Sequence, residues 1–163
     1  MLTFGTCICY RNDTYPGNIL FYEEWTDDSS EILIVCDNEL QMLCNIIPLD
    51  LRGVISLQEY YESRTAGAMT KKIRSIKAFK GLGSPMKKTE NGWVPDWESR
   101  YFTTDFSFGL KIIRDIAEIF SVATPCMDMV WDWYVSALKM NKMRANSIKV
   151  IAEDLEKIYG IDL

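Results

Sequence analysis

The sequence predicts an all-α domain of about six helices, preceded by one short N-terminal strand. Three observations lead to this class. Apolar residues recur at helical spacing in several separate segments, residues that start and stop helices bound these segments, and a single run near the N-terminus is rich in β-forming residues. The chain has 163 residues, of which 48% are hydrophobic, so it can bury one compact core but has no room for a second full domain.

The N-terminal run LTFGTCICY, from Leu2 to Tyr10, has the composition of a strand, and the turn-prone RNDTYPGN follows it. A lone strand cannot form a sheet and needs partner strands from elsewhere. We therefore expect residues 1–14 to be a residual strand and linker beside a neighbouring domain, and residues 15–163 to form the helical domain.

The first helix is expected from about Ser29 to Ile46. The acidic cap Thr26-Asp27-Asp28 precedes it and Pro48 marks its end. Its apolar residues at helical spacing are Ile32, Val35, Cys36, Leu40, Leu43 and Ile47.

The middle of the chain predicts two shorter helices and a loop. Ser56-Leu-Gln-Glu59 is a capping box that opens a short helix through Arg64, and a second helix runs from about Ala68 to Phe79. Glycines and a proline stop it at Gly81, Gly83 and Pro85. Residues 86–99 read as a long ordered loop, a kind of segment that often carries function.

The second half predicts three further helices, at about residues 105–121, 125–140 and 147–159. The first has the apolar stripe Phe108, Ile112, Ile113, Ile116 and Phe120, and the last stops at Gly160. The middle one is apolar around most of its circumference, which favours a central or interface position. We expect core or interface packing, in preference to a substrate pocket, for Trp93, Trp97, Trp131, Trp133, Tyr134, Met127 and Met129.

Charge and hydropathy exclude two classes of partner. The net charge of -5 argues against a long basic face for a phosphate backbone, so no nucleic acid is expected. The sequence has no apolar run near the roughly 20 residues that span a bilayer and no signal-peptide pattern. We therefore expect no membrane partner and a cytoplasmic location.

The five cysteines are scattered, and they have neither disulfide-framework nor zinc-ribbon spacing. They are typical of buried thiols in a reducing compartment. Cys7-x-Cys9 would place two sulfurs on one strand face, but no histidine or second pair accompanies it, so no metal is expected.

The sequence contains no histidine, which removes the commonest general acid/base near neutral pH. Any acid/base chemistry in this chain therefore has to use carboxylate, lysine, tyrosine or cysteine side chains.

Two strings carry a family resemblance. Residues 99–125, SRYFTTDFSFGLKIIRDIAEIFSVATP, resemble the helical domain of octopine, nopaline and related opine dehydrogenases, with an arginine, an aspartate five residues later, an aromatic-Gly pair and a downstream Thr-Pro. Residues 15–40 are similar to the opening of that domain and contain the acidic pair Asp37 and Glu39. The likeness extends over about residues 3–163, and the later string is the specific part.

The resemblance implies an NAD(P)H-dependent reductive condensation of an amino acid with a 2-oxo acid. In this family the cofactor binds an N-terminal Rossmann domain, and the substrates lie in the cleft between that domain and the helical one. The expected partners are thus both substrates and a Rossmann domain or a homodimer partner. NAD or NADP is expected only if a Rossmann domain is supplied, because Gly81-Leu-Gly83 follows a basic helix and is not a dinucleotide-binding turn.

The resemblance assigns Arg100 to gripping a substrate carboxylate, a task that suits the planar guanidinium. The alternative is an arginine before a helix that pairs on the surface with Asp96, Glu98 or Asp105. Asp105 matches the aspartate that orients a catalytic histidine. An aspartate just before a helix is also a preferred N-cap, and both roles can coexist.

The family's histidine is expected in a short turn ending His-Pro, and here the turn is Asn12-Asp-Thr-Tyr15-Pro16. Tyr15 thus stands in its place, although a phenol of pKa about 10 is a poor base at neutral pH. Three explanations stay open: a lost activity, an altered mechanism with tyrosine as proton donor, or a turn displaced by a few residues. Since Asp37 and Glu39 lie two apart on a helix, they face different directions, and we expect Glu39 to form a surface or domain-contact salt bridge.

Two functions compete. The first is the substrate-binding half of an opine-dehydrogenase-like oxidoreductase, inactive alone because the Rossmann domain and catalytic histidine are absent. The second is a standalone, non-catalytic helical module for self-association or protein binding.

Overall fold

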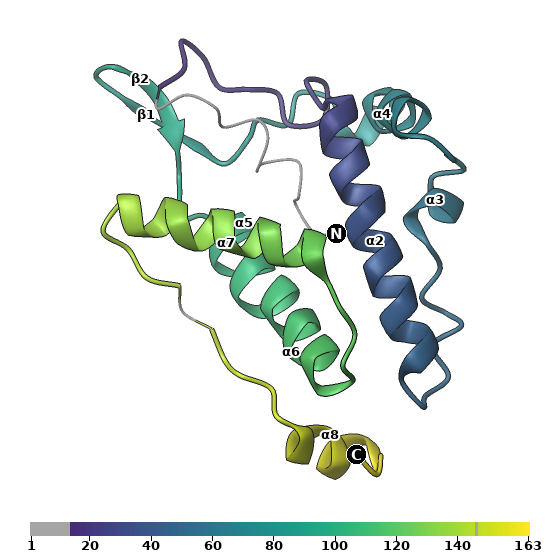
Figure 1. Cartoon of the computed structure of the whole chain (residues 1–163). Coiled ribbons are helices and arrows are strands. Elements are labelled where there is room, and N and C mark those ends of the chain that lie inside the picture. Colours follow the sequence, from purple (N-terminus) through teal and green to yellow (C-terminus); the bar gives the residue numbers. More distant parts are fainter. Residues whose placement is uncertain (1–13, 146) are drawn as a thin grey trace.

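The computed structural model describes residues 14–145 and 147–163, and most of this part is helical (Figure 1). In chain order the elements are α2 (Asp27–Ile46), α3 (Leu57–Tyr60), α4 (Ala66–Ser75), the 3₁₀ turn η1 (Lys77–Phe79), β1 (Met86–Thr89), β2 (Gly92–Pro95), α5 (Arg100–Thr103), the π-helical segment η2 (Asp105–Leu110), α6 (Lys111–Ile119), α7 (Pro125–Met140) and α8 (Ala152–Tyr159). The predicted all-α class is confirmed. The expected strand at residues 2–10 lies outside the described residues.

The central element is α2, which packs against both α4 and α7 (Figure 1). It begins two residues earlier than predicted, because the Thr26 side chain accepts a hydrogen bond from the Ser29 N–H at 3.2 Å. The buried Ser30 hydroxyl accepts from the Trp25 indole at 2.9 Å and lies 2.8 Å from the Thr70 hydroxyl of α4. This buried polar chain fixes α2 against α4 and leaves none of its groups unsatisfied.

One hydrophobic core lies between α2, α4, η2 and α7. Its buried members are Phe21, Trp25, Leu33, Cys36, Tyr61, Met69, Ile73, Phe102, Phe106, Leu110, Met127, Val130, Tyr134 and Leu138. The expected core position of the aromatic helix α7 is confirmed for Tyr134, which is 1% exposed and stacks on Phe106 at 4.5 Å.

Three apolar side chains that the sequence placed in buried stripes or the core are exposed: Val35, Phe108 and Met129. The buried side of α2 is centred on Leu33 and Cys36, and Val35 lies roughly 200° around the helix from Leu33. Phe108 lies in η2, where the wider π turn shifts the phase of the apolar pattern.

Residues 86–99 contain a β-hairpin, so the prediction of a loop throughout was wrong. β1 and β2 are antiparallel, with Met86 opposite Pro95 and Thr89 opposite Gly92. β1 is too polar and too exposed to show the alternation that indicates a strand. The hairpin extends from the helices at the upper left of Figure 1.

Helix boundaries differ from the predictions in three further places. α3 ends at Tyr60, α4 ends at Ser75 before the separate turn η1, and α8 begins only at Ala152. The residues before α8 are held differently: the buried carboxylate of Asp115 accepts from the Val150 N–H at 3.0 Å and pairs with Lys111. This contact ties the C-terminal segment to α6.

Both members of the acidic pair are buried and cap other helices, so the predicted salt bridge of Glu39 was wrong. Glu39 is 3% exposed and accepts from the N–H groups of Cys126 and Met127, at 2.7 and 2.9 Å, in the first turn of α7. Asp37 accepts from the Leu57 N–H of α3 at 2.8 Å. The expected divergence of the two side chains is confirmed, and each serves the positive end of a different helix.

Within residues 14–145 and 147–163, no helix is both long enough and apolar enough to cross a membrane.

Candidate functional site

Tyr15 is held against the hairpin by backbone pairing. Its N–H donates to the Trp93 carbonyl at 2.9 Å, and its carbonyl accepts from the Trp93 N–H at 2.8 Å. Farther along, the Phe21 N–H donates to Leu82 at 2.8 Å, so both ends of the segment 15–21 are fixed. In Figure 1 this segment crosses the upper edge of the molecule from the hairpin toward α2.

Gly92 permits this close approach. Its φ is +125°, and a Cβ atom built there would lie 2.6 Å from the Tyr15 carbonyl oxygen. A side chain at position 92 would therefore both strain the backbone and push Tyr15 away from β2.

Arg100 is the exposed first residue of α5, and the neighbouring side chains explain its position. Ser99 caps the helix by accepting from the Tyr101 N–H at 3.2 Å, and the fully buried Phe102 anchors it against Trp97 at 4.6 Å. Over the part of the chain that the structure describes, Arg100 takes part in no ion pair; Asp96 lies instead 3.9 Å from Lys87. The surface pairing considered for Arg100 does not form, and its guanidinium can receive an anionic group.

Asp105 is half-buried at the start of η2. The Thr104 carbonyl accepts from both the Phe108 N–H at 3.0 Å and the Gly109 N–H at 3.2 Å, and the second bond makes the turn wider than an α-helical one. The N-cap interpretation of Asp105 was wrong, because the chain is already helical from Arg100 and its cap is Ser99. π-helical turns are rare and are frequent at functional sites.

Tyr22 lies near Asp105, although the sequence analysis did not single it out. Burial raises the pKa of its hydroxyl, and the nearby Tyr101, Tyr61 and Asp105 raise it further. Its ring stacks on Phe79 at 4.0 Å. Two features of the sequence could have pointed to Tyr22: it lies within the matched string 15–40, and its neighbour Tyr101 directly follows Arg100.

Tyr15 pairs with β2 through its backbone, and Asp105 lies near Tyr22. Arg100 and Asp105 lie on one continuous helical run, from α5 into η2. The site candidates thus come from two parts of the chain: the segment before α2, which pairs with the hairpin, and the α5–η2 run.

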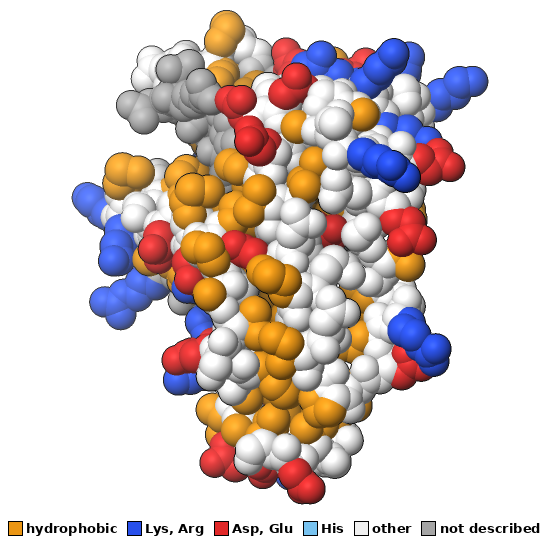
Figure 2. Space-filling model, turned by 45° about the vertical axis from the view of Figure 1, so that its right-hand side comes forward, with side chains coloured by type: hydrophobic (Ala, Val, Ile, Leu, Met, Phe, Trp, Pro, Cys, Tyr) orange, Lys and Arg blue, Asp and Glu red, His pale blue; other side chains and the backbone are white. Residues whose placement is uncertain are grey.

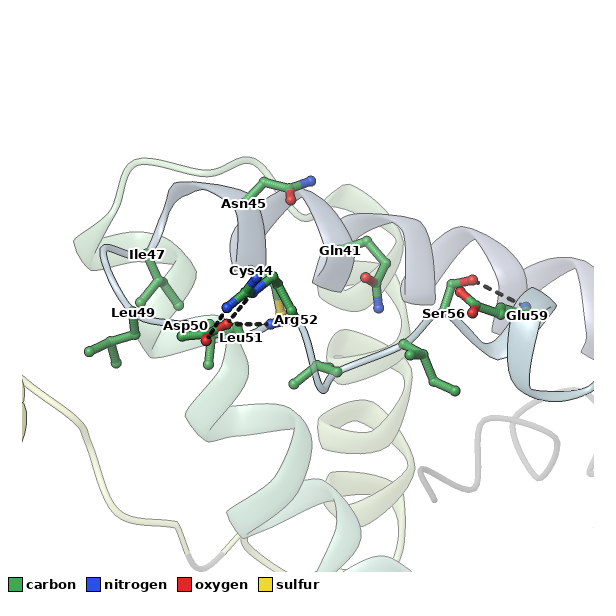
Figure 3. Close-up of a pocket in the computed structure, with 12 residues that line it drawn as sticks. Gln41, Cys44, Asn45, Ile47, Leu49, Asp50, Leu51, Arg52, Ser56 and Glu59 are labelled. Carbon is green, nitrogen blue, oxygen red and sulfur yellow. Dashed lines mark hydrogen bonds and ion pairs between the residues drawn. The ribbon is translucent and has the colours of Figure 1, made fainter.

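A hollow of about 700 Å³ lies at the other end of α2, between its last turns and the loop that follows (Figure 3). Asp50 and Arg52 point toward each other there, with Arg52 Nη2 2.8 Å from Asp50 Oδ2. This pair is exposed and self-satisfied, and the carboxylate of Glu59 also lines the hollow. Burial raises the pKa of the Cys44 thiol on its wall, which makes that sulfur less nucleophilic at neutral pH.

Among residues 14–145 and 147–163, no group of three histidine, cysteine or carboxylate side chains could hold a metal ion. The pair Cys7-x-Cys9 lies outside the described residues.

Comparison with known proteins gives consistent results. The family "NAD/NADP octopine/nopaline dehydrogenase, alpha-helical domain" matches residues 7–138. A tauropine dehydrogenase from Arabella iricolor is 32% identical over 126 residues, covering 70% of this chain and 32% of the relative. An octopine dehydrogenase from Pecten maximus is 26% identical over 143 residues, covering 81% of this chain and 36% of the relative.

Solved structures agree. Octopine dehydrogenase with NADH and pyruvate superposes with a TM-score of 0.70 at 26% identity, over 83% of this chain and 35% of that one. The structure with NADH and agmatine gives 0.71 at 25% identity, over 85% and 37%. The chain spans about a third of the length of these relatives. It belongs to the family of octopine/nopaline dehydrogenase α-helical domains.

Proposed function

We propose that this chain is the substrate-side domain of an opine-dehydrogenase-like oxidoreductase, which condenses an amino acid with a 2-oxo acid and reduces the resulting imine with NAD(P)H. Membership of the family and the names of the relatives support this reaction class. The observation that carries the site is the π-helical turn beginning at Asp105, five residues after the exposed guanidinium of Arg100.

Arg100 grips a substrate carboxylate in this proposal. Both substrates carry a carboxylate, and an exposed guanidinium can donate two parallel hydrogen bonds to the two carboxylate oxygens. The Ser99 cap and the buried Phe102 side chain hold α5 in place, and so fix the direction in which the Arg100 guanidinium projects.

Asp105 and Tyr15 form the acid/base part, with tyrosine in the position of the family's histidine. A neutral phenol can donate a hydrogen bond or a proton, and a nearby carboxylate would favour the positive charge that develops on a protonated amine. By itself the chain does not turn over, because the hydride donor binds a nucleotide-binding domain and the chain has no histidine.

The hydride donor is NAD or NADP, and it is bound only when a Rossmann domain is supplied. Related octopine dehydrogenases were solved with NADH together with pyruvate, L-arginine or agmatine, which indicates the kind of substrate pair to test first. The reaction takes place in the cytoplasm, where the cysteines stay reduced.

The test joins this chain to the nucleotide-binding domain of the Pecten maximus relative and follows NADH oxidation with pyruvate and L-arginine. In the fusion that also carries Tyr15→His, so that turnover can be measured, we expect Arg100→Gln to raise the KM for the substrates by about 10- to 100-fold, because a bidentate charged contact is lost. Arg52→Gln is the matched control, since Arg52 is also exposed but pairs with Asp50 at the far end of α2. Equal kinetics for the two variants would contradict the role of Arg100.

The same fusion tests position 15. Tyr15→His should raise turnover by about 10²- to 10⁴-fold, the typical contribution of a positioned acid/base group, and the additional change Asp105→Asn should remove most of that gain. A fusion that binds NADH but gains nothing from Tyr15→His would refute the assignment of Tyr15 to the catalytic position.

A second function is self-association, and exposed apolar side chains favour it. Figure 2 shows apolar side chains gathered on one face, most densely at its lower end. On α2 the exposed residues Val35, Met42 and Ile46 follow each other at helical spacing, so they form a stripe. Light scattering over a hundredfold range of concentration would separate the two functions: a stable dimer supports self-association, whereas a monomer leaves this stripe to another domain of the enzyme.

A further inference from the structure

The sulfurs of Cys36 and Cys126 lie 3.3 Å apart, although the two residues are 90 positions apart in the chain. Cys36 is in the middle of α2 and is 1% exposed, whereas Cys126 is in the first turn of α7 and is only partly buried. The Cys126 sulfur also lies 3.9 Å from the Ile32 carbonyl, one turn before Cys36. It therefore rests directly on α2, in contact with the other thiol.

Glu39 holds this arrangement in place. It lies three residues after Cys36, on the same side of α2, and accepts hydrogen bonds from the N–H groups of Cys126 and Met127. The start of α7 is thus fixed against α2 at the level of the two sulfurs. Joining them requires the two sulfurs to approach by about 1.3 Å, to the disulfide bond length.

We propose that Cys36 and Cys126 are a redox modification site, at which a small-molecule disulfide converts the two thiols into a cross-link between α2 and α7. The Cys126 thiolate attacks the reagent and releases one thiol, and the Cys36 thiolate then displaces the second thiol from the mixed disulfide. Two protein thiols and one oxidised reagent give one protein disulfide and two reduced thiols, so the step is balanced. Cys126 is the entry point because it is the more exposed of the two residues.

The reduced state is the resting one. Burial raises the pKa of the Cys126 thiol; the hydrogen bond from Cys36 offsets part of this rise and the charge of Glu39 adds to it, so thiolate is scarce at neutral pH. The cross-link would close a long loop that contains the hairpin, α5, η2 and α6, and therefore also Arg100 and Asp105. Oxidation would stabilise the part of the chain that carries the candidate site.

The experiment incubates the whole chain in glutathione buffers of increasing oxidised fraction, blocks the remaining thiols by alkylation, and maps peptides by mass spectrometry without reduction. We expect a linked peptide pair containing Cys36 and Cys126, and a melting temperature roughly 10 °C above that of the reduced chain. Reduction should reverse both changes.

Two variants complete the design. Cys126→Ala should abolish the linked peptide and the temperature rise, whereas Cys44→Ser, which changes another half-buried thiol, should keep both. The proposal is overturned if no link forms, if either cysteine is found joined to Cys7, Cys9 or Cys44, or if the linked chain melts no higher than the reduced chain.

Discussion

The seam between α2 and α7 and the edge that carries the candidate site are held together by different means. At the seam, buried carboxylate and apolar side chains fix helix against helix, as the contacts of Glu39 with α7 illustrate. At the edge, backbone pairing, a glycine with positive φ and a π-helical turn hold the chain. The seam therefore tolerates little loss of side-chain atoms, whereas the edge depends on backbone conformation and can vary many of its side chains.

The largest effect is expected at the seam, for Glu39→Ala. This change leaves two backbone N–H groups at the start of α7 without their acceptor and opens a small cavity, so the free energy of unfolding should fall by about 3–5 kcal/mol in urea denaturation. Glu39→Gln is the control, since its amide oxygen can still accept one of the two bonds, and it should lose less. If both variants were as stable as the native chain, the carboxylate would not hold the seam.

At the edge, Gly92→Ala should lower the free energy of unfolding by about 2 kcal/mol, through the positive φ and the contact with the Tyr15 carbonyl. Amide hydrogen exchange should be faster at Tyr15 and Trp93, because the two backbone hydrogen bonds between these residues would be weakened. Gly53→Ala is the matched control, because a Cβ there meets no atom within 4 Å. A similar loss at both positions would show that the edge does not depend on this close approach.

The smallest effect concerns Asp37. Burial raises the pKa of its carboxyl group, and the hydrogen bond from the Leu57 N–H offsets part of that rise. A raised folded-state pKa means that protonation favours the folded chain, so the contribution of Asp37 to stability grows as the pH falls through that pKa toward about 4. Asp37→Asn keeps an acceptor for the Leu57 N–H and does not titrate. We expect its free energy of unfolding to be within about 1 kcal/mol of that of the native chain at neutral pH, and to become lower than that of the native chain as the pH falls.

Unfolding curves of both proteins across this pH range measure the difference. A stability difference that stays constant with pH, or one that shifts in favour of Asp37→Asn on acidification, would contradict the raised pKa.

Local patterns predicted the helices better than the contacts between them. The acidic cap before α2, Pro48 and the aromatic α7 gave the class, the end of α2 and both ends of α7, because caps and apolar spacing are encoded within a few residues. The burial of Glu39 was missed, because its partners lie 87 and 88 residues away and a charged side chain on a helix usually faces solvent. The π turn at Asp105 was missed because a helical period cannot reveal one extra residue in a turn.

The candidate site was also predicted in part from the sequence and in part only from the structure. The family resemblance supplied Arg100, Asp105 and Tyr15, and the family is confirmed, whereas the roles of these residues stay predictions. Tyr22 lies within the matched string 15–40, but its closeness to Asp105 is visible only in the structure.

The two carboxylates of α2 also constrain how this family can change. Asp37 and Glu39 are separated by Asn38 alone, yet they accept hydrogen bonds from the first turns of two helices that lie about 20 and 88 residues downstream. An insertion of one residue between them would rotate one carboxylate by about 100° relative to the other and leave one helix start without its acceptor. This short peptide should therefore resist insertions and deletions, because each carboxylate has to face its own helix start.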